Sequence, residues 1–238
     1  PDSILEIDEK NYLSFSPRLI RFGSSGLAGV WAEENTRESI YNAFRRKETF
    51  GTSGTRIKVR FFAGYNFENS NLNDQDLIQE AYSKNVPMGG DMIQEKGKNP
   101  RFLVWAISDP LGAPLQRLQI IKGWLEDGEH KEKVFDVACS DGLSVDPITH
   151  RCPDNNAAVN LDDCSISTDK GNSEIKTFWK DPEFSQDQDS FYYSRVLENP
   201  TCRWSTWDAV RAGETPRSDI PLTIQERAWS SPIWYSYE

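Results

Sequence analysis

The chain has 238 residues, a formal net charge of −10 and an aromatic content of 12%, including 8 Trp. This length suits one large domain or two small ones, and the aromatic content is that of a folded chain rather than a disordered one. The acidic balance argues against non-specific binding to nucleic acid or anionic lipid, and no apolar run reaches the roughly 18–20 residues that span a bilayer.

The first well-defined element is a helix, predicted by the stretch NTRESIYNAFRRKETFG. Asn35 is a suitable N-cap, and Glu38 follows it by three residues. Ile40, Ala43 and Phe44 recur at helical spacing and predict the buried face. Basic residues near the end of the stretch complement the helix dipole, so this basic run needs no ligand to explain it.

The sequence after this helix alternates between apolar and polar residues. Ile57, Val59 and Phe61 predict the buried side of a strand. Similar patterns predict strands at 57–62, 101–108, 115–125, 131–138 and 190–198, short helices at 74–85 and 205–213, and an extended aromatic segment at 222–235. We expect Ser205 to cap the last helix, and Leu118, Ile120 and Lys122 to share one face of their strand. An Asp-Gly pair at 127–128 predicts a tight hairpin turn.

Residues 139–173 show almost no periodicity and predict a long loop held by disulfides. The 4 cysteines are Cys139, Cys152, Cys164 and Cys202. Three pairings are possible, and we favour Cys139 with Cys152 and Cys164 with Cys202. Disulfides predict a periplasmic or secreted protein. A metal site using His150 and Cys152 is the alternative, which the content of only 2 His disfavours.

Motifs for catalysis are absent from the sequence. The spacings of a nucleophile elbow and of phosphate-binding glycine loops do not occur. A cluster of oxygen ligands for calcium is conceivable at Asp181, Glu183, Asp187 and Asp189, although no stretch matches the twelve-residue calcium loop. Four tryptophans near the C-terminus, at Trp204, Trp207, Trp229 and Trp234, could form a platform for sugars or bases, although core packing is the commoner role.

Long blocks of the chain resemble a known family. The blocks include SGLAGVWAEENTRESIYNAFRRKETFGTSGTRIKVRFFAGY, PRFLVWAISDPLGAPLQRLQIIKGW and SFYYSRVLENPTCRWSTWDAVRAG. Together they resemble the C-terminal portion of the family named domain of unknown function 3604, which is similar to the PHP (polymerase and histidinol phosphatase) metal-dependent hydrolases. Residues 36–54 resemble the segment that follows the last metal-ligand motif of that group.

The resemblance implies a fold of two parts. Residues 1–56 are expected to be the terminal α/β segment of a distorted β/α (PHP-like) barrel, and residues 57–238 an antiparallel β-rich domain with the disulfide-pinned loop. The H-x-H and D-x-H motifs that hold metal in PHP proteins do not occur in this chain. No metal ligand is therefore assigned here, and divalent Zn, Mn or Fe is expected on an N-terminal portion of the same protein. Because the chain begins at Pro1, we expect that a preceding segment was removed.

The functional expectation follows from the same resemblance. The chain would be the C-terminal fragment of a secreted or periplasmic metal-dependent hydrolase of phosphoesterase type, completing the barrel and shaping the cleft for a small phosphate-ester-like substrate. By itself it would be inactive. Glu33 and Arg37, near the expected barrel mouth, could reach the substrate or the metal ligands. The alternative is a non-catalytic β-rich module that binds glycan, protein or calcium.

Overall fold

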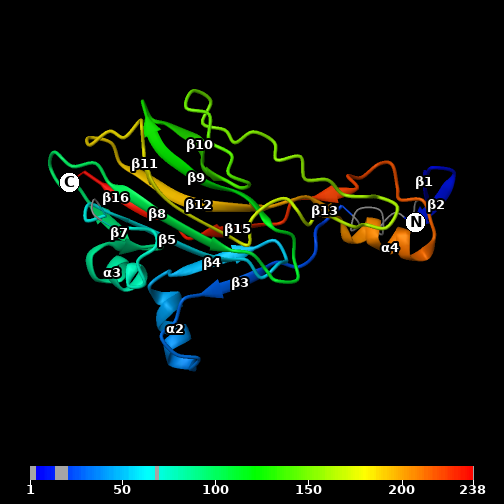
Figure 1. The fold of residues 1–238 in the computed structure, drawn as a ribbon, viewed down its shortest axis with the longest axis horizontal. Coiled ribbons are helices and arrows are strands. Elements are labelled where there is room, and N and C mark those ends of the chain that lie inside the picture. The colour runs from blue at the N-terminus through cyan, green and yellow to red at the C-terminus, as the bar shows by residue number, and fades with distance from the viewer. Residues whose placement is uncertain (1–3, 14–20, 68–69, 238) are drawn as a thin grey trace.

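The computed structural model describes residues 4–13, 21–67 and 70–237, and its main body is two β-sheets packed face to face (Figure 1). The larger sheet has the order β10 (Glu129–Cys139), β9 (Leu115–Glu126), β12 (Ser190–Glu198), β15 (Arg227–Ser230), β4 (Thr49–Thr52) and β3 (Leu27–Val30). The smaller sheet has the order β11 (Glu174–Lys180), β8 (Arg101–Ile107), β5 (Lys58–Gly64) and β6 (Val86–Pro87).

Two further strands extend the larger sheet at one end. β16 (Ile233–Ser236) lies beyond β15, so the two pair with successive parts of β12. β16 also pairs with β7 (Asp91–Ile93), and this is the parallel pairing of the sheet. The described strands otherwise pair antiparallel, as expected for sheets built from hairpins and long returns.

Strict alternation along the strands explains why the sheets face each other. On β5, Val59, Phe61 and Ala63 point into the space between the sheets, whereas Phe62 points to the opposite side. Successive side chains of a strand point to opposite faces, so each sheet presents one apolar face to the other. From the larger sheet, β9 and β12 contribute buried apolar residues to the same core.

The outer face of the smaller sheet is covered by a helix. α3 (Leu77–Lys84) packs Leu77 and Ala81 against Phe62 and Leu103. This produces a second, smaller apolar cluster, so the body has three layers in the order helix, sheet, sheet (Figure 1). The predicted helix at 74–85 is therefore confirmed, with slightly shorter bounds.

The helix predicted near the N-terminus is present as α2 (Arg37–Arg45), but details of its prediction are wrong. Thr36, not Asn35, is the N-cap, because its side chain accepts a hydrogen bond from the Ser39 amide at 3.2 Å. Ala43 is buried as expected, whereas Phe44 is 51% exposed. The helix lies at the edge of the larger sheet, and Ala43 is its buried residue (Figure 1).

The other end of the molecule carries a small helical cap. α4 (Trp204–Ala212) lies beside the paired strands β13 (Thr201–Cys202) and β14 (Thr223–Ile224), near the hairpin of β1 (Ile4–Ile7) and β2 (Lys10–Leu13) (Figure 1). The predicted stop at Gly213 is confirmed by its left-handed conformation, with φ of 69°. The predicted cap is wrong, because Arg203 occupies the cap position and Ser205 is buried within the first turn.

The expected β/α barrel portion is wrong. β3 and β4, which flank α2, pair with each other antiparallel, whereas successive strands of a β/α barrel are parallel. α2 is thus an insertion in a hairpin rather than a barrel crossover, and the described strands form open, mainly antiparallel sheets. The division of the chain near residue 56 stays a prediction, although β3 and β4 belong to the same sheet as β9 and β12.

Candidate anion-binding pocket

The outer face of the larger sheet gathers arginines from adjacent strands. Arg117 on β9 and Arg227 on β15 both pair with Leu197 of the central strand β12, one on each side. Residues directly opposite each other in a sheet share a face, and two strand spacings separate these arginines by about 10 Å at the backbone. Arg195, two residues before Leu197 on β12, lies on the same face.

A pocket of about 710 Å³ opens over Arg117 and Arg227, whereas Arg195 lies outside its lining. The residues that give it its chemistry are Gln116, Arg117, Asp154, Arg203, Gln225 and Arg227. This set contains three arginines and one aspartate, so the lining is rich in positive charge within a chain of net charge −10. We call it the arginine pocket.

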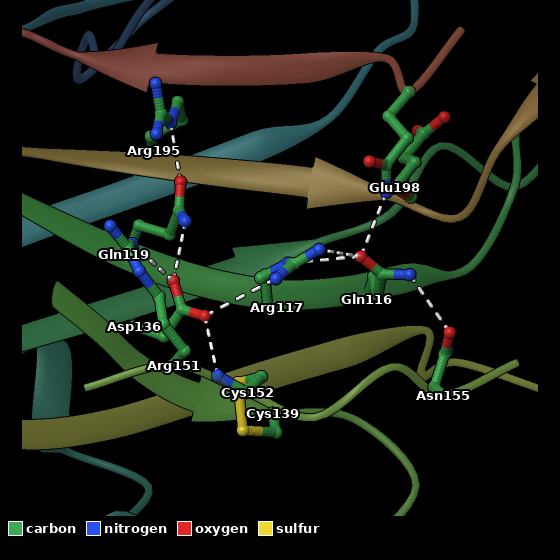
Figure 2. Close-up of polar contacts among 11 residues, drawn as sticks. Gln116, Arg117, Gln119, Asp136, Cys139, Arg151, Cys152, Asn155, Arg195 and Glu198 are labelled. Carbon is green, nitrogen blue, oxygen red and sulfur yellow. Dashed lines mark hydrogen bonds and ion pairs between the residues drawn. A yellow bond between two sulfur atoms is a disulfide. The ribbon is translucent and has the colours of Figure 1, made fainter. Parts of the chain in front are cut away.

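Gln116 fixes the direction of Arg117. Its side-chain oxygen accepts hydrogen bonds from Nε and Nη2 of Arg117, at 3.1 and 2.7 Å, and a third from Gln225 at 2.9 Å. Its side-chain nitrogen donates to Asn155 at 3.0 Å, which ties it to the loop after β10 (Figure 2). Arg117 is thus held in place before any ligand arrives, which lowers the entropy lost on binding.

Asp136 organises the other side of the site. Its buried carboxylate accepts hydrogen bonds from Gln119 at 2.6 Å and from the Cys152 amide at 2.7 Å, and it forms ion pairs with Arg117 and Arg151 (Figure 2). A buried carboxylate needs such partners to remain charged. Asp136 therefore neutralises part of the positive charge of Arg117 and leaves Arg227 with a larger role in the pocket.

Two arginines have capacity to bind an anion. Arg227 donates from Nε to the Gln225 carbonyl at 3.1 Å, and Arg195 donates from Nε to Gln119 at 2.6 Å. Among the described residues, the terminal nitrogens of both side chains have no hydrogen-bond or ion-pair partner. A guanidinium held at Nε with its outer edge free is suited to bidentate binding of an oxyanion.

A β-bulge and a disulfide close the pocket. The pairing of β10 with β9 shifts between Asp136 and Ala138, which places Cys139 opposite Arg117. Cys139 and Cys152 are joined, and Cys164 is joined to Cys202, as predicted. The first bridge holds the loop after β10 against the sheet, and the second ties a later part of that loop to the strand preceding Arg203.

Next to this network lies a buried acid, Glu198, at the end of β12. Its side chain is 0% exposed, and neither carboxylate oxygen has a hydrogen-bond partner in the described part of the chain. Burial raises the pKa of Glu198 to about 7, and the nearby charges of Glu226 and Asp109 add to this effect. The nearby Thr55 hydroxyl and Ala113 backbone act in the opposite direction and offset part of the rise in pKa.

The residues expected at a barrel mouth lie elsewhere. Glu33 is exposed, accepts a hydrogen bond from Ser39 at 3.1 Å and pairs with Arg46 at 3.3 Å. Hydrogen bonds from its own amide and from Ser39 lower the pKa of Glu33. Arg37 is an exposed residue in the first turn of α2. Neither residue lines the arginine pocket, and their role near a substrate stays a prediction.

The alternative ligand sets are occupied by other contacts. Cys152 is in a disulfide, so a thiolate site with His150 is excluded for this state. Asp181 is buried against Lys122, with 2.8 Å between Nζ and Oδ2, and Glu183 pairs with Lys133. Within the residues described, no group of three or more His, Cys, Asp or Glu is arranged to hold a metal ion.

Sequence reasoning missed the arginine pocket. The arginines are far apart in sequence and each fits an ordinary strand pattern, so no local motif marks them. The available signal was that Arg195 and Arg227 occupy outward positions of strands in an acidic chain, where an acidic or neutral residue would be equally compatible with the fold. Their convergence depends on the strand order.

One known protein family matches nearly the whole chain. A family model described as "Protein of unknown function (DUF3604)" matches residues 4–237. No curated protein and no solved structure shows a significant match. None of the helices in the described ranges is long and apolar enough to cross a membrane.

Proposed function

Because the chain belongs to the DUF3604 family, whose description assigns no activity, we propose a function from the geometry of the chain itself. It is a disulfide-stabilised β-sandwich module that binds an anionic group in the arginine pocket. The observation that carries this proposal is the presence of Arg117, Arg203 and Arg227 around one polar pocket of about 710 Å³. Sulfate, phosphate and carboxylate are the groups that planar guanidinium recognises best.

The compartment proposed for this module is oxidising. Both disulfides lie in or beside the loop that closes the pocket, so the site depends on them. Disulfides persist outside the cell or in a periplasm and are rare where thiols are kept reduced. The two disulfides therefore support a periplasmic or secreted location as part of the proposal.

The test is titration of the purified chain with sodium sulfate, sodium phosphate and sodium acetate, followed by calorimetry. Arg227→Gln should weaken binding about tenfold, since a hydrogen bond to a charged group contributes about 1.5–3 kcal/mol and 1.4 kcal/mol is a factor of ten. Arg45→Gln is the matched control, because Arg45 is exposed on the distant helix α2. Equal weakening by both variants would indicate charge screening and would count against a built site.

A second function is favoured by the same chemistry. A phosphate ester is an anion, so the arginine pocket is compatible with the expected small phosphate-ester-like substrate of a PHP-like hydrolase. In this form of the proposal, metal ligands for Zn, Mn or Fe come from an N-terminal portion of the same protein, and this chain holds the charged end of the substrate. The earlier expectation that the chain completes a barrel is not part of it.

This second function has its own measurement. A longer protein that contains this chain and the H-x-H and D-x-H motifs should hydrolyse p-nitrophenyl phosphate in the presence of Mn²⁺. Arg227→Gln in that protein should raise KM about tenfold and leave kcat nearly unchanged, because it removes binding shared by the substrate and the transition state. Unchanged KM with active enzyme would separate the pocket from the reaction.

A further inference from the structure

A second pocket, of about 410 Å³, lies on the same outer face of the larger sheet. Its floor and walls are mainly apolar and include Gly123, Trp124, Phe191 and Trp234. Charged and polar side chains stand at its rim, among them Glu132 and Asp189. We call it the aromatic pocket. Its volume lies within the range of sites for small ligands, about 300–1,000 Å³.

The pocket is built from one row of the sheet. Gly123 on β9 pairs with Phe191 on β12, and Phe191 pairs with Trp234 on β16. On the other side of Gly123 the row continues to Glu132 on β10. These residues therefore share the outer face, and the aromatic rings stand directly beside the glycine.

Gly123 allows Phe191 to lie across the neighbouring strand. A Cβ at this position would lie 2.3 Å from the outermost ring carbon of Phe191, which is far inside contact distance. The ring thus covers the glycine rather than standing away from the sheet. Trp234 is 45% exposed, and its ring centroid lies 5.0 Å from that of Phe191 with the ring planes inclined by 46°, so the two rings form an open, angled apolar surface.

The rim indicates the kind of ligand. Glu132 on β10 and Asp189, which precedes β12, can accept hydrogen bonds from hydroxyl groups, while His130 and Lys131, next to Glu132 on β10, can donate. Charges of both signs around an apolar floor disfavour a strongly charged ligand in this pocket. A neutral pyranose ring fits, because it presents apolar C–H faces to aromatic rings and hydroxyl groups around its edge.

A line of side chains connects this pocket to the arginine pocket. Every second residue of β12 points to the outer face, and these include Phe191, Tyr193 and Arg195. The rings of Phe191 and Tyr193 are stacked with centroids 6.4 Å apart. Leu197, the centre of the arginine row, is six positions beyond Phe191 on β12, which is about 20 Å along a strand. One oligosaccharide of a few residues could contact both pockets.

We propose that the aromatic pocket binds a neutral sugar ring of an acidic glycan whose charged group occupies the arginine pocket. The part of this statement that concerns the charged group rests on the proposed function. The part that concerns the sugar ring rests on Gly123, Phe191, Trp234 and the mixed rim, and it stands independently.

The experiment uses tryptophan fluorescence and calorimetry with defined probes. The probes are cellohexaose and mannohexaose as neutral glycans, a hyaluronan octasaccharide as an acidic glycan with alternating uncharged rings, sodium sulfate, and tetramethylammonium. The hyaluronan octasaccharide and at least one neutral glycan should bind at millimolar concentration. Trp234→Ala should weaken both about tenfold, as loss of one stacking contact predicts, and leave sulfate binding unchanged.

Three further variants show whether a loss of glycan binding is specific to the aromatic pocket. Glu132→Ala changes an exposed rim residue that the fold does not need, and it should weaken the glycans about threefold. Trp204→Ala is the matched control, because Trp204 is similarly exposed, at 40%, but lies on α4. Arg227→Gln should weaken the hyaluronan octasaccharide and leave the neutral glycans unaffected.

The outcomes separate the two proposals. Sulfate binding without binding of any glycan overturns the sugar site and leaves the proposed function standing. Glycan binding that is insensitive to Trp234→Ala and Glu132→Ala also overturns it. Neutral glycan binding without binding of sulfate, phosphate or acetate supports the sugar site and overturns the proposed function. Tetramethylammonium binding that requires Trp234, without glycan binding, would show a cation site instead.

Discussion

The carboxyl group of Glu198 makes the stability of this protein depend on pH. Its pKa in the folded protein is raised to about 7, above the ordinary value of 4.5. Below pH 4.5 the group is protonated in both the folded and the unfolded chain and carries no penalty. Between pH 4.5 and 7 the unfolded chain loses the proton first, so the free energy of unfolding falls as pH rises.

We predict that Glu198→Gln raises the free energy of unfolding at pH 8, because a neutral amide replaces a carboxylate that has no partner. A shift of this size corresponds to about 3 kcal/mol as an upper limit, since one pKa unit is about 1.4 kcal/mol. Urea unfolding at pH 5 and pH 8 measures the effect. The difference between the two pH values should shrink in the variant.

The control for this prediction is Glu129→Gln. Glu129 is exposed in the β9–β10 hairpin, where its side chain pairs with Lys131. An exposed pair contributes little, so this variant should keep the pH dependence of the parent. If Glu198→Gln keeps the same dependence as the parent, the raised pKa does not belong to Glu198.

At the scale of elements, the loop after β10 depends on its bridge to the sheet. We predict that replacing Cys139 and Cys152 together by Ser lowers the free energy of unfolding by roughly 3 kcal/mol, the amount typical of a short closed loop. Because the Cys152 amide also binds Asp136, the arginine pocket should lose order and sulfate binding should weaken severalfold. Calorimetry and urea unfolding report the two effects separately.

A variant of similar stability but distant from the pocket shows whether the loss of binding is local. Leu77→Ala removes a buried side chain from α3 on the far side of the smaller sheet, at a cost of about 2–5 kcal/mol. Its sulfate affinity should match that of the parent. Equal weakening in both variants would mean that sulfate binding follows overall stability instead of the loop.

The success of sequence reasoning differs among elements for physical reasons. β5, β8, β9 and β12 were predictable because each has seven or more residues and is rich in the aliphatic and aromatic side chains that strands favour. The Asp-Gly turn was predictable because Asp127 and Gly128 both need positive φ, and they have it, at 52° and 79°. β6 and β7 have two and three residues, too few for a period to appear.

The barrel error shows what local pattern leaves open. A strand, a capped helix and a second strand look alike in sequence whether the strands end up parallel or antiparallel. β3 and β4 have four residues each and pair antiparallel, which no property of α2 determines. The arginine pocket was hidden for the same reason, because Arg117 and Arg227 meet only through their common neighbour β12.

At the scale of the whole molecule, a buried polar group joins the two sheets. Lys122 on β9 forms an ion pair with Asp181, which directly follows β11, and both side chains are almost fully buried. Tyr192 on β12 donates its hydroxyl hydrogen to the same carboxylate at 2.8 Å. Burial raises the pKa of Tyr192, and the charge of Asp181 adds to this effect. This group connects the larger sheet to the smaller one within the shared core.

We predict that Lys122→Met destabilises the protein by about 3–5 kcal/mol, because it leaves the carboxylate of Asp181 buried without its cation. A triple variant with Lys122→Met, Asp181→Leu and Tyr192→Phe removes every charged or hydroxyl group of the cluster and should recover most of that loss, since apolar replacements of a buried ion pair are often neutral. Urea unfolding of the parent, the single variant and the triple variant measures both steps. If the single variant costs less than about 1 kcal/mol, within the range of an exposed pair, Lys122 and Asp181 are hydrated and do not bridge the sheets as described.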